Sequence, residues 1–219
     1  MKNIIFIGAG GFGSECYQYL LDVMNIDKNI FFKGFLSTSN DLAPYGLQKY
    51  FLGHYDDYDF EENDYLVIAI GSPIARYRLY HHFKSKGLKF YNLISPKAFI
   101  THTNNIGECN VIAPFSTLGI NTIIGHANLI GPYSLIGHDC RIGDFNFVSS
   151  YVSFGGGASI GNLNFLAHKA TLTPKTLVQN NCTISANSVV SKKLRDNSIA
   201  LGNPAETIGT NPIQENYNV

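Results

Sequence analysis

An apolar residue occupies every sixth position of the chain from Ile100 to Val190, without exception. Neither an α-helix, with its 3.6-residue period, nor an alternating strand repeats in this way. A period of six is typical of short strands joined by tight corners, each placing one apolar side chain in a shared interior. Three such strands close one triangular coil of eighteen residues, so the period predicts a parallel β-helix. The column residues are Ile100, Ile106, Ile112, Leu118, Ile124, Ile130, Ile136, Ile142, Val148, Phe154, Ile160, Leu166, Leu172, Val178, Ile184 and Val190.

The positions beside each column residue also repeat. The residue two places before it is usually small, as at Asn110 and Ser116, and should fit the narrow interior beside the larger side chain. The residue after it is usually glycine, as at Gly107 and Gly137. We expect these glycines at the corners because glycine tolerates backbone angles that are closed to other residues.

Composition excludes several partners. The 219 residues carry 16 basic and 16 acidic side chains. The chain therefore lacks the excess of positive charge that is typical of nucleic acid binding. No apolar run approaches the roughly 20 residues that span a bilayer, and we expect no membrane insertion. The apolar run near Met1 is too short for the core of a signal peptide. The four cysteines lack metal-ligand spacing, which favours free thiols in a reducing cytoplasm.

The first 95 residues have a different pattern, which predicts a small Rossmann-like α/β domain with a parallel sheet. The expected strands are residues 3–7, 30–36, 65–70 and 90–94, and the expected helices are residues 14–24 and a segment carrying Arg76 that ends near Lys86. Residues 96–219 would then form the β-helix, closed by a C-terminal cap over residues 192–204. The predicted fold is therefore α/β + β, in two domains, 1–95 and 96–219.

A glycine-rich turn follows the first expected strand. Its spacing fits G-x-G-x-x-G between a strand and a helix, where backbone N–H groups can face a phosphate. No acid stands at the end of the second strand to hold a ribose, which argues against a complete dinucleotide. The glycines either serve only close strand–helix packing or form a shallow pocket for part of a nucleotide, and we favour the pocket. The candidate ligand residues at the carboxyl edge of the sheet are Gly8, Gly10, Gly11, Phe12, Gly13, Ser37, Thr38, Gly71 and Ser72.

Histidines supply the candidate chemistry. His102, His126, His138 and His168 each stand two places after a column residue, near a corner. Only His138 is followed directly by a carboxylate, Asp139, which can fix the imidazole tautomer and raise its basicity. The alternative is that all four are solvated surface residues. Their spacing does not fit a three-histidine metal site, so we expect no metal.

Stretches along almost the whole chain resemble one family, the sugar acetyltransferases of the sialic acid O-acetyltransferase type. It includes the N-acetyltransferases that acylate the C4 amine of nucleotide-linked 4-amino-4,6-dideoxysugars. The resemblance implies a left-handed β-helix of hexapeptide repeats and acetyl-CoA as co-substrate. The stretches are residues 7–13, 34–36, 69–71, 92–96, 136–145 (Ile-Gly-His-Asp-Cys-Arg-Ile-Gly-Asp-Phe) and 202–205 (Gly-Asn-Pro-Ala).

The resemblance also implies roles for particular residues. His138 would be the general base, Asp139 the acid beside it, and Gly156 the residue whose backbone N–H faces the thioester carbonyl. Independently, Gly156 lies eighteen residues after His138, which places it one coil further on the same face. The resemblance implies that acetyl-CoA lies near Gly156, Ala167, His168 and Ala186, between two subunits of a homotrimer. The nucleotide-linked amino sugar would bind the first domain.

Two positions depart from the family. Phe147 stands where some nucleotide-aminosugar acetyltransferases carry a second histidine, and Ser37–Thr38 stands where they often carry an acidic pair. The sequence therefore favours N-acetylation of a nucleotide-linked 4-amino-4,6-dideoxysugar, for cell-surface glycan biosynthesis. It leaves open O-acetylation of sialic acid or a surface polysaccharide. A non-catalytic β-helix module, which would bind no CoA, is a third alternative.

Overall fold

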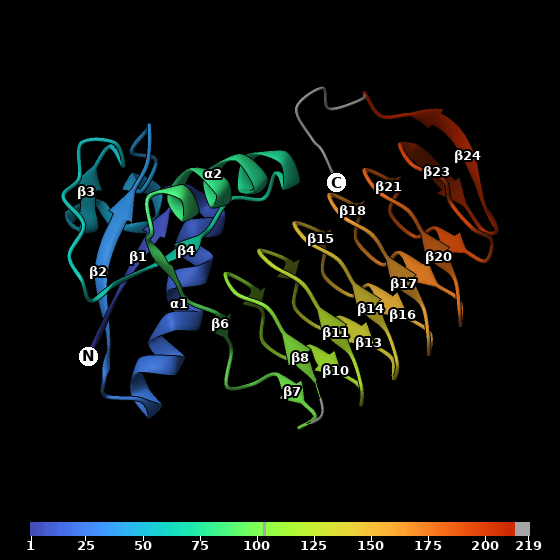
Figure 1. The fold of residues 1–219 in the computed structure, drawn as a ribbon, viewed down its shortest axis with the longest axis horizontal. Coiled ribbons are helices and arrows are strands. Elements are labelled where there is room, and N and C mark those ends of the chain that lie inside the picture. Colours follow the sequence, from blue (N-terminus) through green and yellow to red (C-terminus); the bar gives the residue numbers. More distant parts are fainter. Residues whose placement is uncertain (103, 213–219) are drawn as a thin grey trace.

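A computed structural model describes residues 1–102 and 104–212. An α/β region at one end is followed by a long stack of short strands that leads away from it (Figure 1). This arrangement confirms the predicted fold class, an α/β region followed by a left-handed parallel β-helix. In the described part of the chain, no helix is both long and apolar enough to cross a membrane.

The α/β region is a five-stranded parallel sheet in the order β3-β2-β1-β4-β5. Alternate residues of β1 are buried on opposite faces, Ile4 against α1 and Ile5 against α2, which is why the central strand is apolar from Ile4 to Ile7. The elements are β1 (Lys2–Ile7), α1 (Gly11–Ile26), β2 (Ile30–Leu36), the 3-10 turns η1 (Ala43–Tyr45) and η2 (Gln48–Tyr50), β3 (Phe51–Gly53), β4 (Asp64–Ile68), α2 (Pro73–Ser85) and β5 (Lys89–Phe90).

Two sequence-based expectations for this region need correction. The first helix begins at Gly11, inside the glycine-rich turn, and not at residue 14. The expected strand over residues 90–94 is wrong as a single element. Phe90 ends β5 of the α/β sheet, whereas β6 (Leu93–Ile94) pairs with β9 of the β-helix, because the chain has already turned into the first coil.

The β-helix has three faces, and each two-residue strand from β7 to β22 ends on a column residue. Strands eighteen residues apart pair in parallel, as Leu118 does with Ile136. The first face holds β7 (Phe99–Ile100), β10 (Thr117–Leu118), β13 (Leu135–Ile136), β16 (Ser153–Phe154), β19 (Thr171–Leu172) and β22 (Val189–Val190). The second face holds β8 (Asn105–Ile106), β11 (Ile123–Ile124), β14 (Arg141–Ile142), β17 (Ser159–Ile160) and β20 (Leu177–Val178).

The third face begins with β6 and ends in an antiparallel hairpin, β23 and β24, whose first strand lies within residues 192–204, the segment expected to cap the helix. Ala200 and Ala205 of this hairpin pack into the β-helix core. The remaining strands of the face are β9 (Val111–Ile112), β12 (Leu129–Ile130), β15 (Phe147–Val148), β18 (Phe165–Leu166), β21 (Thr183–Ile184), β23 (Ser198–Gly202) and β24 (Ala205–Thr210).

The interior matches the sequence pattern. Column residues from Ile112 to Val190 are buried in one continuous core. Behind the third face the small residues form a ladder, in which the Oδ1 atom of Asn128 accepts hydrogen bonds from the backbone N–H and the side-chain amide of Asn146. Asn110 and Asn164 extend the same ladder. These buried amides have partners, as a polar group in an apolar core requires.

The corner glycines have a different role from the one expected. Positive φ falls on the third residue after every column residue from Ile106 to Ile184, where side chains as large as Phe115 (φ 61°) and Tyr133 (φ 58°) occur. A Cβ atom on Gly137, which directly follows a column residue, would lie 2.7 Å from the Phe154 carbonyl oxygen of the next coil. Glycine follows the column residues because successive coils stack closely there.

The α/β region covers one side of the β-helix. Cys109, Ala127, Phe145 and Leu163, at the second corner (between the second and third faces), pack with residues of α2 and β4. Val111 and Ala113 of the third face pack with α1. The third corner, with Phe115, Tyr133 and Tyr151, separates the third and first faces, and the first corner separates the first and second faces. The first corner therefore lies across the prism from the α/β region.

Candidate active site

The first corner brings a histidine and a carboxylate together. His138 Nδ1 lies 2.7 Å from Asp139 Oδ2. Asp139 is in the left-handed conformation, φ 59°, and its N–H donates to the Ile120 carbonyl at 2.9 Å. Its Oδ1 atom accepts from Asn121 Nδ2 at 2.6 Å. The carboxylate is thereby fixed between two donors, and a proton on Nδ1 leaves the Nε2 lone pair of His138 free to accept another.

Electrostatics favour the ionised carboxylate. The hydrogen bond from His138 lowers the pKa of Asp139 below its usual value, and the hydrogen bond from Asn121 lowers it further. Both side chains are more than half exposed. A substrate can therefore reach the imidazole, and Asp139 remains an acceptor for Nδ1–H at neutral pH.

Gly156 lies directly against this imidazole, as the eighteen-residue coil predicts. A Cβ atom on Gly156 would stand 2.5 Å from His138 Nε2 and 2.7 Å from Cε1. Only a glycine leaves room for the ring in this position. Among the described residues, no hydrogen-bond acceptor meets the N–H of Gly156, whereas its carbonyl accepts from Lys175 N at 3.0 Å. The corner thus places a basic nitrogen beside a free backbone donor.

The glycine-rich turn forms a second group of candidate residues. All nine of them follow β1, β2 or β4 at the carboxyl edge of the parallel sheet: Gly8, Gly10, Gly11, Phe12, Gly13, Ser37, Thr38, Gly71 and Ser72. Gly10 is the N-cap of α1, and Ser72 is the N-cap of α2, where its hydroxyl accepts from Ala75 N at 3.4 Å. Gly13 has no space for a side chain because the Gly8 carbonyl lies against its Cα.

A cleft of about 80 Å³ joins this turn to the β-helix. Phe12, Glu15 and Tyr19 of α1 form one wall, and residues of the third face and third corner form the other, among them Pro132, Ser149 and Ser150. The cleft connects the candidate nucleotide site with the third corner of the β-helix. It does not include His138.

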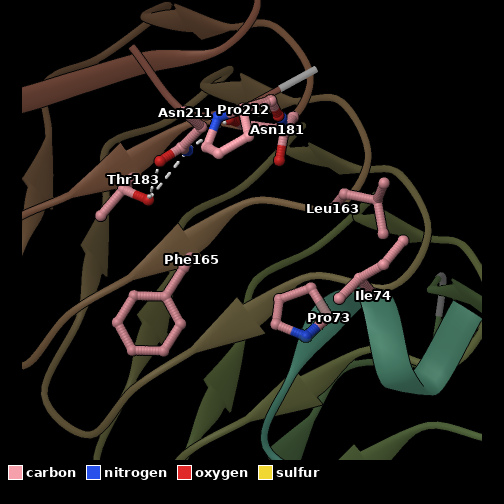
Figure 2. Close-up of a pocket in the computed structure, with 8 residues that line it drawn as sticks. All are labelled: Pro73, Ile74, Leu163, Phe165, Asn181, Thr183, Asn211 and Pro212. Atoms are coloured by element: carbon pink, nitrogen blue, oxygen red, sulfur yellow. Dashed lines mark hydrogen bonds between the residues drawn. The ribbon is translucent and has the colours of Figure 1, made fainter. Parts of the chain in front are cut away.

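A larger pocket of about 170 Å³ lies between the first residues of α2 and residues 211–212, and Phe165 is one of the side chains that line it (Figure 2). The ring of Phe165 stacks on Phe147 with centroids 4.8 Å apart. The polar groups that line the pocket bond one another, since Asn211 Nδ2 donates to Thr183 Oγ1 at 3.0 Å. Phe147, at one of the two positions where the sequence departs from the family that it resembles, is a packing residue of the third face, where it also lies close to Gly71.

The candidate cofactor residues Ala167, His168 and Ala186 form a third group, at the third corner. His168 meets the ring of Tyr151 edge to face, at 5.4 Å between centroids. Below it the rings of Phe115, Tyr133 and Tyr151 stack at 5.0 Å intervals and are each about half exposed. Of the four predicted cofactor residues, only Gly156 shares a corner with His138. One chain therefore does not bring the three groups together.

His126 and the cysteines are structural residues. The Nδ1 atom of His126 accepts from Glu108 N at 3.1 Å, and the backbone N–H of His126 donates to Asp144 Oδ1 at 2.6 Å, which ties successive coils together. All four cysteines are buried and unpaired. The described residues contain no cluster of metal-ligating side chains.

Sequence reasoning gave no role to Arg76. It is buried, and its guanidinium donates only to backbone carbonyls of the α/β region and the β-helix. No local pattern marks it, because its acceptors are distant in sequence.

No protein-family model and no curated protein sequence matches the chain. Solved structures do resemble it. PerB from Caulobacter crescentus, solved in complex with CoA and GDP-perosamine, has a TM-score of 0.80 and 22% identity, over 95% of this chain and 98% of PerB. The acetyltransferase domain of PglB from Neisseria gonorrhoeae has a TM-score of 0.82 and 19% identity, over 95% and 100%. WeeI from Acinetobacter baumannii AYE has a TM-score of 0.64 and 20% identity, over 95% and 100%. At these identities the likeness shows a common fold.

Proposed function

We propose that the protein is an acetyl-CoA-dependent N-acetyltransferase acting on the 4-amino group of a nucleotide-linked 4-amino-4,6-dideoxysugar. The observation that carries the proposal is the first corner, where His138 is held by Asp139 and rests on Gly156. The shared fold with PerB, whose complex contains CoA and GDP-perosamine, supports both substrate classes. A role in cell-surface glycan biosynthesis and a cytoplasmic location complete the proposal.

The proposed reaction is a direct transfer. The amine nitrogen attacks the thioester carbonyl carbon, and His138 Nε2 takes the proton that the nitrogen loses. The Gly156 N–H donates to the oxyanion of the tetrahedral intermediate, which is the kind of stabilisation that a fixed backbone dipole supplies. Collapse of the intermediate breaks the C–S bond, and His138 returns its proton to the departing thiolate. Asp139 keeps Nδ1 protonated throughout, so that Nε2 is the nitrogen that exchanges protons.

The proposed site is shared between subunits. The glycine-rich turn lies over the third face, while His138 lies at the first corner, across the prism, so a site that uses both takes them from different copies. We propose a homotrimer in which the third corner of one subunit, with Ala167, His168 and Ala186 along acetyl-CoA, faces His138 of the next. The exposed aromatic stack of the third corner supports such burial. Ile120 and Leu135, exposed near His138, support it as well.

Thiol release from acetyl-CoA tests the proposal. UDP-, dTDP- and GDP-linked 4-amino-4,6-dideoxysugars would be offered beside free and CMP-linked sialic acid, to the wild type and to His138→Ala. We expect turnover with one aminosugar and a fall of about 10²- to 10⁴-fold in the variant, the usual contribution of a general base. Turnover with a sialic acid alone would replace the proposal with O-acetylation. The absence of both turnover and acetyl-CoA binding would leave a non-catalytic module.

A further inference from the structure

Arg76 joins the α/β region to the β-helix through its entire guanidinium group. The residue lies in the first turns of α2 and is 1% exposed. Nη1 donates to the carbonyls of Ile70 and Gly71 at 2.9 and 3.0 Å. Nε donates to the Ala127 carbonyl at 2.9 Å, and Nη2 to the carbonyls of Phe145 and Asn146 at 3.1 and 2.7 Å. These five bonds match the five N–H donors of an arginine.

The group is charged although none of these acceptors is a carboxylate. Burial lowers the pKa of Arg76 to about 9, which still leaves it cationic at neutral pH. A buried charge is costly unless its hydrogen bonds are complete, and here five carbonyl dipoles complete them. The neighbours in this part of the core are largely apolar, so an apolar side chain could fill the volume, but it would leave the carbonyls of Ile70, Gly71 and Ala127 without this donor. The arginine also fixes the relative positions of these carbonyls, because the planar guanidinium donates its hydrogen bonds in fixed directions.

The acceptors belong to three segments that come together only in the tertiary structure. Ile70 and Gly71 form the turn between β4 and α2, at the edge proposed to bind the nucleotide-linked sugar. Ala127 and Phe145 are left-handed residues at the second corner, in successive coils, with φ of 50° and 59°. Asn146 belongs to the buried asparagine ladder. Arg76 thus ties a ligand-binding turn to the most regular part of the β-helix.

We propose that Arg76 is a positioning residue, which fixes the Gly71–Ser72 turn, and hence the bound aminosugar, relative to the β-helix that holds acetyl-CoA. This inference rests on the proposed function. Arg76 touches neither substrate. The contribution of Arg76 would appear in the rate of reaction between the two bound substrates, because that rate is sensitive to a misplacement of about 1 Å.

The proposal predicts a specific kinetic pattern. In Arg76→Lys the ammonium keeps the charge but, as a point charge with three donors, cannot reproduce the fork. We expect kcat/KM for the aminosugar to fall by on the order of 10-fold or more, while the dissociation constant of CoA, measured by calorimetry, stays within about twofold. Arg78→Lys is the matched control, since Arg78 is exposed on the same helix, and it should behave as the wild type.

A role confined to stability predicts a different result. In that case Arg76→Lys has a lower Tm but an unchanged kcat/KM once folded. That result would overturn the proposal, as would a loss of CoA affinity equal to the loss of kcat/KM for the aminosugar.

A second measurement does not depend on turnover. Amide hydrogen exchange in the folded Arg76→Lys protein should rise at residues 70–76 and stay unchanged in the coils beyond residue 165, which Arg76 does not contact. If the wild type fails to acetylate any aminosugar, the proposed function fails. Unchanged exchange at residues 70–76 in the variant would instead show that Arg76 does not hold the turn.

Discussion

The imidazole of His138 and the Cα of Gly156 are in direct contact, so closely that a methyl group on Gly156 would lie 2.5 Å from His138 Nε2. The two residues are eighteen positions apart and occupy the same place in successive coils. Gly156 therefore supplies both the space for the imidazole ring and a backbone donor beside its Nε2 atom. Gly157 N, the next donor along the chain, bonds the His138 carbonyl at 2.8 Å and keeps the two coils in register.

Gly156→Ala should disable the proposed base without unfolding the protein. The new methyl group displaces the exposed His138 ring, which can turn into solvent, so we expect kcat to fall by about 10²-fold with little change in Tm. Gly209→Ala is the control, because its methyl group would meet only Ile199 Cδ1, at 3.7 Å. Wild-type kcat in Gly156→Ala would mean that the ring position is irrelevant to catalysis.

Asp139 offers a pair of substitutions that separates charge from backbone strain. Asparagine tolerates the left-handed conformation at this corner, but its amide cannot accept from both His138 and Asn121, so Asp139→Asn should lower kcat by about 10- to 10²-fold with Tm preserved. Alanine loses the same acceptors and adds strain of about 1 kcal/mol, so Asp139→Ala should lower Tm as well. Equal kcat for Asp139→Asn and the wild type would remove Asp139 from the mechanism.

A mixing experiment tests whether the site is shared between subunits. Gly10→Asp adds a negative charge at the candidate phosphate site, in open space and at an N-cap position that favours aspartate. Both Gly10→Asp and His138→Ala should be inactive alone. Trimers reassembled from equal amounts should recover about a quarter of the wild-type turnover, because one in four interfaces pairs an intact turn with an intact histidine.

The control for that experiment is Gly10→Ser, a neutral residue that also suits the N-cap, mixed with His138→Ala in the same way. It should be active by itself, which shows that the charge and not the side-chain volume inactivates Gly10→Asp. If the mixture of the two inactive variants stays inactive although its subunits exchange, the shared site is wrong.

Glu108 should make stability depend on pH. Burial opposes its ionisation, but hydrogen bonds from Lys84 and from Tyr80 (2.6 Å) outweigh burial and lower the pKa of Glu108. Since the folded pKa lies below the unfolded value of about 4.3, the carboxylate stabilises the fold above that value and loses its effect as the pH falls through the folded pKa. The Tm of the wild type should therefore fall more steeply than that of Glu108→Gln from about pH 5 to pH 3.

The reference for this measurement is Glu206→Gln, at a carboxylate 67% exposed and 3.6 Å from Lys192. Solvent screens such a pair, so its substitution should leave the slope unchanged. Parallel curves for the wild type and Glu108→Gln would show that the bonds to α2 contribute nothing to stability.

The β-helix could be predicted because each six-residue segment places one apolar side chain in the interior. The same requirement repeats in every segment, so the fold appears in the sequence as a period of six. The same repeat placed Gly156 beside His138. The role of the corner glycines was misjudged, since the repeat shows where glycine occurs but not whether conformation or close stacking requires it. The left-handed positions share no single residue type that would reveal them, since they include Phe115 and Leu163 as well as Asp139.

What the sequence by itself determined is therefore the repeat, the parallel α/β pattern before it, and the pairing of His138 with Asp139. Only the tertiary structure decided which side of the β-helix the α/β region covers, and so that the glycine-rich turn and His138 stand on opposite sides of one chain. That placement depends on α2 packing at the second corner and on the five bonds of Arg76, whose β-helix acceptors lie 51 to 70 residues away. Contacts between residues so far apart produce no repeating pattern in the sequence, because each of them occurs only once in the molecule.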